Sequence, residues 1–309
     1  SARPGESLDI KVSSLSQQPY QASLVRVRYA DPNPKGPGVN LENIPSSWEG
    51  TYPSREQKFF PGSYGRVDST GSLCRLEDFS ALITLWPTRP GSGEQTLVSH
   101  QDSTSGWSLF LDDEGCLAAK LRKAGDTRKF RLEGSLRERK WYQAWLTYDA
   151  QTSKLTLGKA ILDPGLKSED QTGSSADYTF QSVSQEIPFL IGAQFSGPID
   201  SHFNGKLEEP KIFSRSLNQQ EIEQAFSGKI PDGLLARWDF SREIPTSRMI
   251  DLGPENLEGY LVNCPARGMT GSCWNGKEMC WRHAPEDYGA VHFHEDDIYD
   301  FGWDTDFTI

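Results

Sequence analysis

Residues 203–222 read Phe-Asn-Gly-Lys-Leu-Glu-Glu-Pro-Lys-Ile-Phe-Ser-Arg-Ser-Leu-Asn-Gln-Gln-Glu-Ile, and this stretch decides the fold that the sequence predicts. Its second half predicts a short helix from Asn218 to Phe226, because Asn218 can cap the helix and Glu221, three residues on, completes a capping box. Gly228 is suited to end the helix in the left-handed conformation. Helical periodicity is scarce elsewhere in the chain, so we expect this helix to sit among strands.

Outward from this stretch, the chain is typical of an antiparallel β protein. It contains 28 glycines and 19 prolines, and its apolar residues fall into short runs separated by turn residues. The run Asp-Asp-Glu-Gly at 112–115 predicts a hairpin turn, and 167–178 is predicted as a long polar loop. Strands are predicted at 79–86, 95–99, 106–111, 116–121, 141–148, 154–157 and 189–192.

The N-terminal sixty residues are predicted as a β segment followed by a loop. Residues 8–12 and 22–27 alternate apolar and polar side chains, as half-buried strands do, and we expect them to form an opening strand pair. Residues 31–50 are rich in Pro, Gly and Asn and are predicted as a loop.

The stretch 203–222 also resembles the closing segment of a laminin-G-like, concanavalin A-type jelly roll. The similarity rests on Phe-x-Gly at 203–205, an acidic pair at 208–209, Ile-Phe at 212–213 and the turn that follows. The resemblance covers about residues 79–226. It implies a mainly β protein, an antiparallel β-sandwich jelly roll with one short helix and an additional C-terminal β segment. Pro210 stands where the family usually has Val, which predicts an edge strand because proline cannot donate to a ladder.

The expected domain organisation has four parts. Residues 1–60 form the N-terminal β segment and loop, and residues 61–230 form the jelly roll. Residues 231–271 look like the opening strands of such a jelly roll although they follow its end, so they either complete the same sandwich or begin a second module. Completion is favoured, because too little chain remains for a second sandwich. Residues 272–309 are expected to be the start of a second, truncated domain.

Charge and cysteine content argue against several functions. The formal net charge is -11, and residues 283–309 hold eight carboxylates without a Lys or Arg. No clustered basic face is visible, so a nucleic-acid partner is not expected. No apolar run approaches the length that spans a bilayer, so no membrane association is expected. Five cysteines without a CxxC pair argue against a zinc finger and favour the cytoplasm over secretion.

The richest chemistry lies in residues 288–300, which hold two histidines, four carboxylates and two tyrosines. If 290–294 is a strand, His292 and His294 share one side, within reach of one cation or one substrate. The carboxylates that follow, among them Asp296 and Asp297, suit a transition metal or hold a neutral histidine as a base. The alternative is a strand that ends in an acidic turn, with both histidines hydrogen-bonded into a neighbouring sheet.

Other polar residues are interpreted as structural. The carboxylates at 112–114 could bind calcium, but an exposed turn is the favoured interpretation. Glu208 and Glu209 are expected to belong to the scaffold of the fold. His100 and His202 are isolated from other metal-ligand residues, so structural or surface roles are expected for both.

A second resemblance is scattered over the whole chain. It rests on Gly-Leu-Leu-Ala-Arg-Trp-Asp-Phe at 233–240, Asn-Cys-Pro-Ala-Arg-Gly-Met-Thr-Gly at 263–271 and His-Phe-His-Glu-Asp-Asp at 292–297. These runs are similar to the large (beta) subunit of the N,N-dimethylformamidase family. The resemblance implies an amide hydrolase whose mononuclear iron is held by two tyrosines and a glutamate, in a chain that continues well past residue 309.

The family resemblance assigns roles to a few positions. Tyr288 is the first candidate for an iron ligand and Tyr299 is its rival, while the second tyrosine and the glutamate are not placed. The candidate catalytic residues are His292, His294, Asp296 and Asp297. For the intact protein the family implies a small amide substrate and an oligomer or a small partner subunit.

Two functions therefore remain open from the sequence. In the first, the chain is the N-terminal portion of a dimethylformamidase-like amide hydrolase, inactive alone, with the jelly roll as an accessory or assembly module. In the second, a stand-alone laminin-G-like module binds a carbohydrate or a protein without catalysis.

Overall fold

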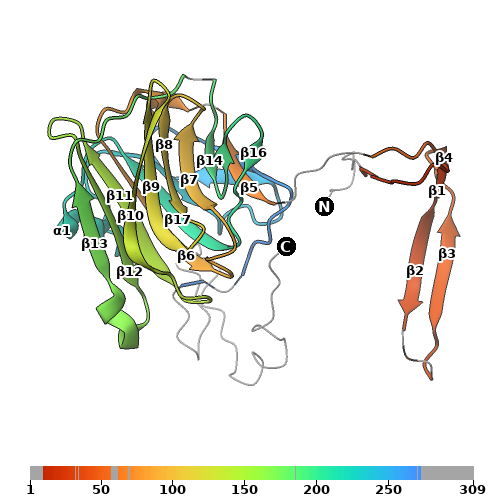
Figure 1. The fold of residues 1–309 in the computed structure, drawn as a ribbon. Coiled ribbons are helices and arrows are strands. Elements are labelled where there is room, and N and C mark those ends of the chain that lie inside the picture. The colour runs from red at the N-terminus through yellow and green to blue at the C-terminus, as the bar shows by residue number, and fades with distance from the viewer. Residues whose placement is uncertain are drawn as a thin grey trace. The chain divides into compact units, whose positions relative to one another are not determined.

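The computed structural model describes residues 10–31, 33, 35–56, 62–68, 70–184, 186–269 and 271–272. The chain divides into two compact units, Ser1–Phe60 and Pro61–Ile309 (Figure 1). Each unit is described by itself below.

The first unit contains two antiparallel hairpin-like pairs among its described residues. β1 (Tyr20–Ala22) pairs with β4 (Gly50–Tyr52), and β2 (Leu24–Ala30) pairs with β3 (Val39–Ile44). The predicted pairing of 8–12 with 22–27 is wrong, because β2 pairs with β3 and residues 10–12 form no strand. Strand β3 was missed because residues 31–50 are rich in Pro, Gly and Asn, a composition typical of loops. Within it, Val39 and Leu41 alternate with polar residues, which is the pattern of a strand.

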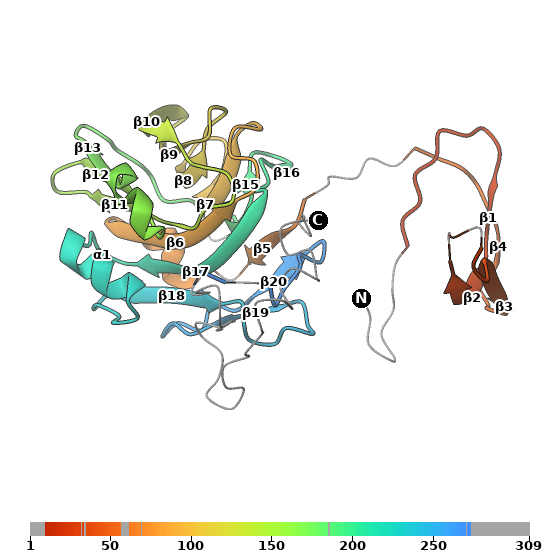
Figure 2. The ribbon, with the colours of Figure 1, turned by 90° about the horizontal axis from the view of Figure 1, so that it is seen from below.

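The second unit is an antiparallel sandwich. Fourteen of its described strands form one sheet in the order β10-β9-β8-β7-β14-β5-β20-β19-β18-β17-β6-β11-β12-β13, and β15 pairs with β16 in a separate two-stranded sheet. The sheet folds over so that the strands at its two ends come together: β10 packs against β12 and β13. Figures 1 and 2 show the resulting layers. This architecture confirms the predicted β-sandwich.

The strands of the second unit have the following bounds: β5 Tyr64–Val67, β6 Phe79–Pro87, β7 Gln95–Gln101, β8 Gly106–Leu111, β9 Cys116–Lys123, β10 Asp126–Ser135, β11 Tyr142–Asp149, β12 Lys154–Ile161, β13 Gln171–Ser175, β14 Phe189–Ile191, β15 Gln194–Phe195, β16 Ile199–Asp200, β17 Gly205–Phe213, β18 Leu234–Asp239, β19 Arg248–Asp251 and β20 Gly259–Val262. One α-helix, α1 (Gln219–Phe226), and two 3₁₀ segments, Gly71–Arg75 and Pro164–Glu169, complete the described elements. All seven strands predicted between residues 79 and 192 are confirmed, whereas β5, β10, β13 and the short strands β15 and β16 were missed. β13 lies inside the predicted polar loop, where its sequence Gln-Thr-Gly-Ser-Ser lacks the apolar alternation that marks a strand.

The main core lies between the layers and is rich in aromatic rings. Phe189 stacks on Trp238 with ring centroids 5.0 Å apart, and Phe79 stacks on Trp107 at 4.6 Å. The indole N–H of Trp238 donates to the carbonyl of Leu257 at 2.8 Å, so this large core side chain has no unpaired polar atom. Burial of these rings, together with the many aliphatic side chains of the same core, supplies the driving force for closing the sandwich.

Helix α1 covers the outer face of the sheet beside β11 and β17. The predicted capping box is confirmed: the Asn218 side chain accepts from the amide of Glu221 at 3.0 Å, and the Glu221 carboxylate accepts from the amide of Asn218 at 2.9 Å. Gly228 follows the helix with φ +89°, the left-handed conformation that glycine adopts freely. Ile222 and Phe226 of the helix pack on Trp145 and form a second, smaller core.

Strand β17 corrects the expectation for Pro210. β17 pairs with β6 on one side and with β18 on the other, so it is an interior strand rather than an edge. Pro210 is tolerated because the register with β6 shifts between Glu208 and Lys211, and a bulge frees the position that would donate a hydrogen bond. Beyond β17, strands β18, β19 and β20 continue the same sheet to β5.

Candidate binding groove

The residues that the sequence proposed for catalysis and iron binding lie outside the described part of the chain. They are Tyr288, His292, His294, Asp296 and Asp297, together with the rival ligand Tyr299. Their roles stay predictions. The last described residues, Gly271 and Ser272, lie against β17: the Glu208 carboxylate accepts from the Ser272 amide at 2.9 Å and from its hydroxyl at 2.6 Å. Glu208 therefore holds Ser272 against β17, the structural role that the sequence predicted for it.

His100 and His202, the two isolated histidines, both pack against aromatic side chains of the sandwich. The Nε2 atom of His100 lies 3.1 Å from the carbonyl of Ile187, and its ring meets Phe189 edge-on in the core. Burial lowers the pKa of His100 to about 4, so the ring is neutral near pH 7. His202 packs against Tyr64 with ring centroids 5.6 Å apart, and partial burial lowers its pKa too.

The carboxylates of the turn at 112–115 form hydrogen bonds and ion pairs with neighbouring residues of the protein. One oxygen of Asp112 accepts from the amides of Glu114 and Cys116, at 3.1 and 2.9 Å. The guanidinium of Arg131 pairs with Asp112 at 3.0 Å and with Glu114 at 2.7 Å. Within the described ranges, no group of three or more His, Cys, Asp and Glu side chains could hold a metal ion. The contacts are those of a hairpin turn, and calcium binding here stays a prediction without support from the geometry.

A groove of about 310 Å³ lies between helix α1 and the outer face of β11, β12 and β13. Its position follows from the register. Trp145 on β11 stands opposite Gly158 on β12, and Gly158 stands opposite Thr172 on β13, so the three positions share one face of the sheet. Phe226 of the helix meets the Trp145 ring edge-on, with centroids 6.4 Å apart. The groove thus has an aromatic wall on one side and polar strand residues on the other.

Gly158 makes the placement of Trp145 possible. A Cβ atom at Gly158 would lie 2.1 Å from two carbons of the indole, so only glycine lets the ring lie across β12. The indole nitrogen is buried and has no hydrogen-bond partner among the described residues, and the same holds for the side-chain oxygen of Gln171. Unpaired buried polar atoms are uncommon, because each costs about 1–3 kcal/mol.

The groove is lined by hydrogen-bonding and charged side chains. Side chains of Gln143, Gln171 and Gln219 offer amides, and Thr172 offers a hydroxyl. Lys167, Asp170 and Glu223 add charges of both signs. Among the described residues that line the groove, none is Ser, Cys or His. The groove thus offers hydrogen-bonding and charged groups beside an apolar face formed by Trp145, Ile222 and Phe226.

A second polar cluster lies on the sheet face under the β15–β16 hairpin. The buried Lys120 ammonium pairs with Glu94 and lies 4.3 Å from the centroid of Phe110. Gln194 joins the cluster by donating to Glu94 at 3.1 Å and accepting from Gln101 at 2.8 Å. Burial acts to raise the pKa of Glu94, but its contacts with Lys120 lower that pKa overall. The cluster ties β15 to β7 and β9, a structural role.

Sequence reasoning missed both features, because their parts come from distant segments. The groove combines residues 143 and 226, and the polar cluster combines residues 94 and 194. The one local signal is Lys120, which lies between Ala119 and Leu121 in the apolar first part of β9; a lysine at a buried position is unusual unless its charge is paired.

Comparison with known proteins supports the expected family. The model of the concanavalin A-like lectin/glucanases superfamily matches residues 61–223. The chain is 33% identical over 338 aligned positions to the N,N-dimethylformamidase beta subunit of Paracoccus aminophilus, and 32% identical over 335 to that of Alcaligenes sp. Both alignments cover 100% of this chain and 44% of the relative, so the chain spans less than half the length of the curated relatives it matches.

Among solved structures, the chain resembles Ruminococcus gnavus IT-sialidase CBM40 bound to α2,3-sialyllactose. The TM-score is 0.44 at 15% identity, covering 54% of this chain and 94% of that one. Among the described residues, no helix combines the length and the apolar character required to cross a membrane. The sheet order, the capped helix and the family match over 61–223 agree, and the chain belongs to the concanavalin A-like lectin/glucanases superfamily.

Proposed function

We propose that this chain is part of the large subunit of an amide hydrolase related to N,N-dimethylformamidase. The single observation that carries the proposal is the identity of 33% and 32% to two N,N-dimethylformamidase beta subunits, which extends over the whole chain and beyond the jelly roll. The substrate is a small amide, and the protein works as one subunit of a larger cytoplasmic assembly.

The sandwich in this proposal is an accessory or assembly module. We assign hydrolysis to the segment at 288–297 rather than to the groove beside α1, because the family resemblance points to that segment. This segment supplies part of the catalytic site: His292 and His294 with Asp296 and Asp297 exchange protons with the substrate, and Tyr288 is an iron ligand. A phenolate is a hard ligand suited to ferric iron, which would polarise the amide carbonyl. The remaining ligands lie elsewhere in the assembly, and the chain alone is inactive.

The test compares the intact gene product with the chain of residues 1–309. Iron content and release of dimethylamine from N,N-dimethylformamide are measured on both. We expect stoichiometric iron and turnover in the intact protein, and neither in the chain alone. A Y288F variant of the intact protein should lose iron, and an H292A/H294A variant should retain its fold but lose turnover. Iron-free and inactive intact protein would refute the proposal.

A second candidate function rests on the groove. Its amide side chains and its apolar wall favour a binding module for a carbohydrate, whose hydroxyl groups accept and donate while its ring carbons present an apolar face. Calorimetric titration of the chain with soluble oligosaccharides tests it. Binding that is lost in a Q143A/T172A variant supports the second function, and the absence of heat with every sugar overturns it.

A further inference from the structure

Buried polar atoms without a partner are concentrated on one face of the sandwich. Among the described residues, ten buried side-chain nitrogen and oxygen atoms make no hydrogen bond, and four of them lie on the adjacent strands β7, β8 and β9. These four belong to Thr96, Gln101, Ser108 and Arg122. In native proteins nearly all buried polar groups are paired with protein or with ordered water, so this concentration indicates a further partner.

Three of these side chains surround Gly106 of β8. Gly106 stands opposite Gln101 of β7 on one side and opposite Arg122 of β9 on the other. The Arg122 guanidinium donates through Nη1 to the carbonyl of Asp102 at 2.7 Å, so its side chain reaches across Gly106 to the end of β7. Ser108 lies two residues beyond Gly106 and therefore on the same face of β8. The unpaired atoms Arg122 Nε, Ser108 Oγ and Gln101 Oε1 thus lie around the space beside the glycine.

This space lies on the outer face of the sheet rather than in the main core. Trp107 and Leu109, on either side of Ser108 in the chain, belong to the main core, as does Leu121. His100 also points inward, where its ring meets that of Phe189. Because side chains alternate along a strand, the residues that follow Leu121 and His100 point outward.

The hairpin β15–β16 and Glu94 close the space from the solvent side. The side-chain nitrogen of Gln101 donates to Gln194 at 2.8 Å, and the side-chain nitrogen of Gln194 donates to Glu94 at 3.1 Å. Glu94 pairs in turn with Lys120, which stands opposite Ser108. A continuous chain of polar groups therefore runs from Gln101 back to the neighbour of Ser108.

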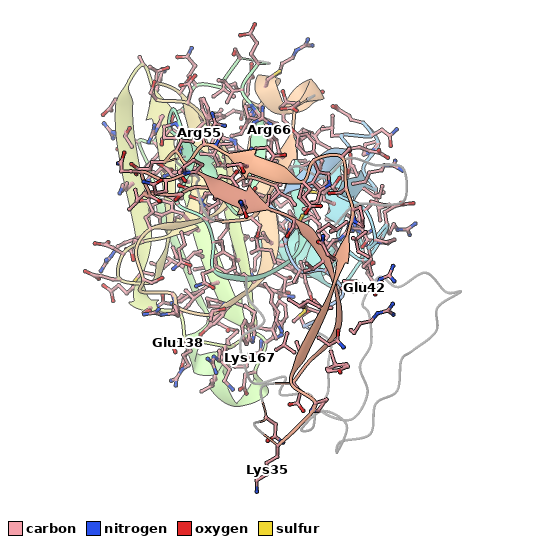
Figure 3. The ribbon with its side chains drawn as sticks, turned by 90° about the vertical axis from the view of Figure 1, so that its right-hand side faces the viewer. Lys35, Glu42, Arg55, Arg66, Glu138 and Lys167 are labelled. Atoms are coloured by element: carbon pink, nitrogen blue, oxygen red, sulfur yellow. The ribbon has the colours of Figure 1, made fainter. Side chains whose placement is uncertain are left out.

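The groups around this space are withdrawn from bulk water. Charged side chains such as those of Glu138 and Lys167, which are labelled in Figure 3, are exposed. Gln101 is only 1% exposed, Ser108 is fully buried and Lys120 is 5% exposed. Bulk solvent therefore cannot pair with the unpaired atoms of Gln101 and Ser108, and a buried polar group without a hydrogen bond lowers stability.

The unpaired atoms specify the chemistry of their partner. Arg122 Nε–H donates, Gln101 Oε1 accepts, and the Ser108 hydroxyl can do either. The partner must therefore both donate and accept, and it must be small, because β7 and β9 lie only roughly 10 Å apart with β8 between them. The Lys120 ammonium and the Arg122 guanidinium disfavour a cation. The Glu94 carboxylate disfavours an anion. Water meets these conditions, and a buried water typically makes about three hydrogen bonds.

We propose that ordered water occupies this space as a built-in part of the sandwich. The water accepts from Arg122 Nε–H, donates to Gln101 Oε1 and bonds with the Ser108 hydroxyl. By fixing the Gln101 amide, it also orients Gln194 and with it β15. The inference goes beyond the proposed function, because it requires neither catalysis nor a partner subunit.

The test is a crystal structure of the chain at atomic resolution, together with thermal unfolding of two variants. We expect electron density for water within hydrogen-bond distance of at least two of the three atoms. S108A removes one bond of the water and should lower Tm by roughly 2–4 °C. S99A is the matched control, because Ser99 stands opposite Ser108 and its hydroxyl donates directly to the Ala193 carbonyl at 2.9 Å. Its loss should lower Tm by a similar amount.

The sign of the S108A effect distinguishes a hydrated site from a dry one. If no water lies there, S108A only deletes an unpaired buried hydroxyl, and Tm should rise or stay unchanged while S99A still lowers it. That result would overturn the inference. A crystal structure without water at this position, or with the three atoms bonded to protein groups or to a larger molecule, would overturn it as well.

Discussion

Replacing Glu209 with alanine should destabilise the sandwich strongly. Glu209 lies in the β17 bulge and pairs with Lys211 at 2.7 Å and with Arg237 on the neighbouring strand. The side chain of Lys211 is only 1% exposed and that of Glu209 only 4%. Removal of the carboxylate leaves the Lys211 ammonium away from water and without this counterion.

The structure sets the scale of the effect. Breaking a buried ion pair by removing one partner costs about 3–5 kcal/mol, because the remaining charge stays desolvated. An exposed pair contributes only about 0–1 kcal/mol. Arg248 and Glu258 form such a pair, with side chains 54% and 40% exposed, so E258A is the matched control. For a domain of this size, the E209A loss should lower Tm by roughly 6–20 °C.

Urea unfolding followed by tryptophan fluorescence measures both variants, with the free energy extrapolated at constant slope. A third variant, E209A/K211M, also removes the Lys211 ammonium while keeping a side chain of similar length at position 211. It should regain most of the lost stability, because a buried pair can often be replaced by apolar groups at little cost. If E209A loses no more than E258A, or if K211M brings no recovery, the electrostatic account of this cluster is wrong.

Three further predictions concern other parts of the sandwich. The G158A variant should lose about 1–3 kcal/mol, since the added methyl group would press the Trp145 ring out of its place; thermal unfolding measures this, and an unchanged Tm would contradict the packing. The pKa of His100 is lowered to about 4 by burial, so the unfolded chain takes up a proton between pH 6.5 and 4 that the folded chain does not. Stability should therefore fall by a few kcal/mol as pH decreases through this window, at about 1.4 kcal/mol per unit, and H100Q should have a flatter profile. The E208A variant should speed hydrogen exchange at the Ser272 amide without changing Tm by more than a few degrees, and an unchanged exchange rate would exclude Glu208 as the anchor.

Local patterns predicted much of the fold. Alternating apolar residues located β8 and β11, and the spacing of Asn218 and Glu221 located the helix and its cap. These signals succeed because they depend on neighbours within a few positions, where side-chain direction follows directly from backbone geometry. The same approach failed at β13 and at β3, where the composition is typical of loops and pairing with a partner strand imposes the extended conformation.

The candidate site was predictable only in part. The proposed catalytic residues follow from sequence and family resemblance, and they lie beyond Ser272, outside the described residues. The groove could not be predicted, because the position of Trp145 depends on a glycine of the next strand and on a helix about eighty residues away. No local pattern relates such residues to each other.

The sequence by itself determined the class of the fold, the helix with its cap, and the similarity of the whole chain to N,N-dimethylformamidase beta subunits. Only the tertiary structure decided that Pro210 sits in an interior strand and that Lys211 is buried between Glu209 and Phe226. The physical reason is the range of the interactions. Helix caps and strand alternation are set within a few residues, whereas strand partners, bulges and buried ion pairs are set by segments that meet only after the chain has folded.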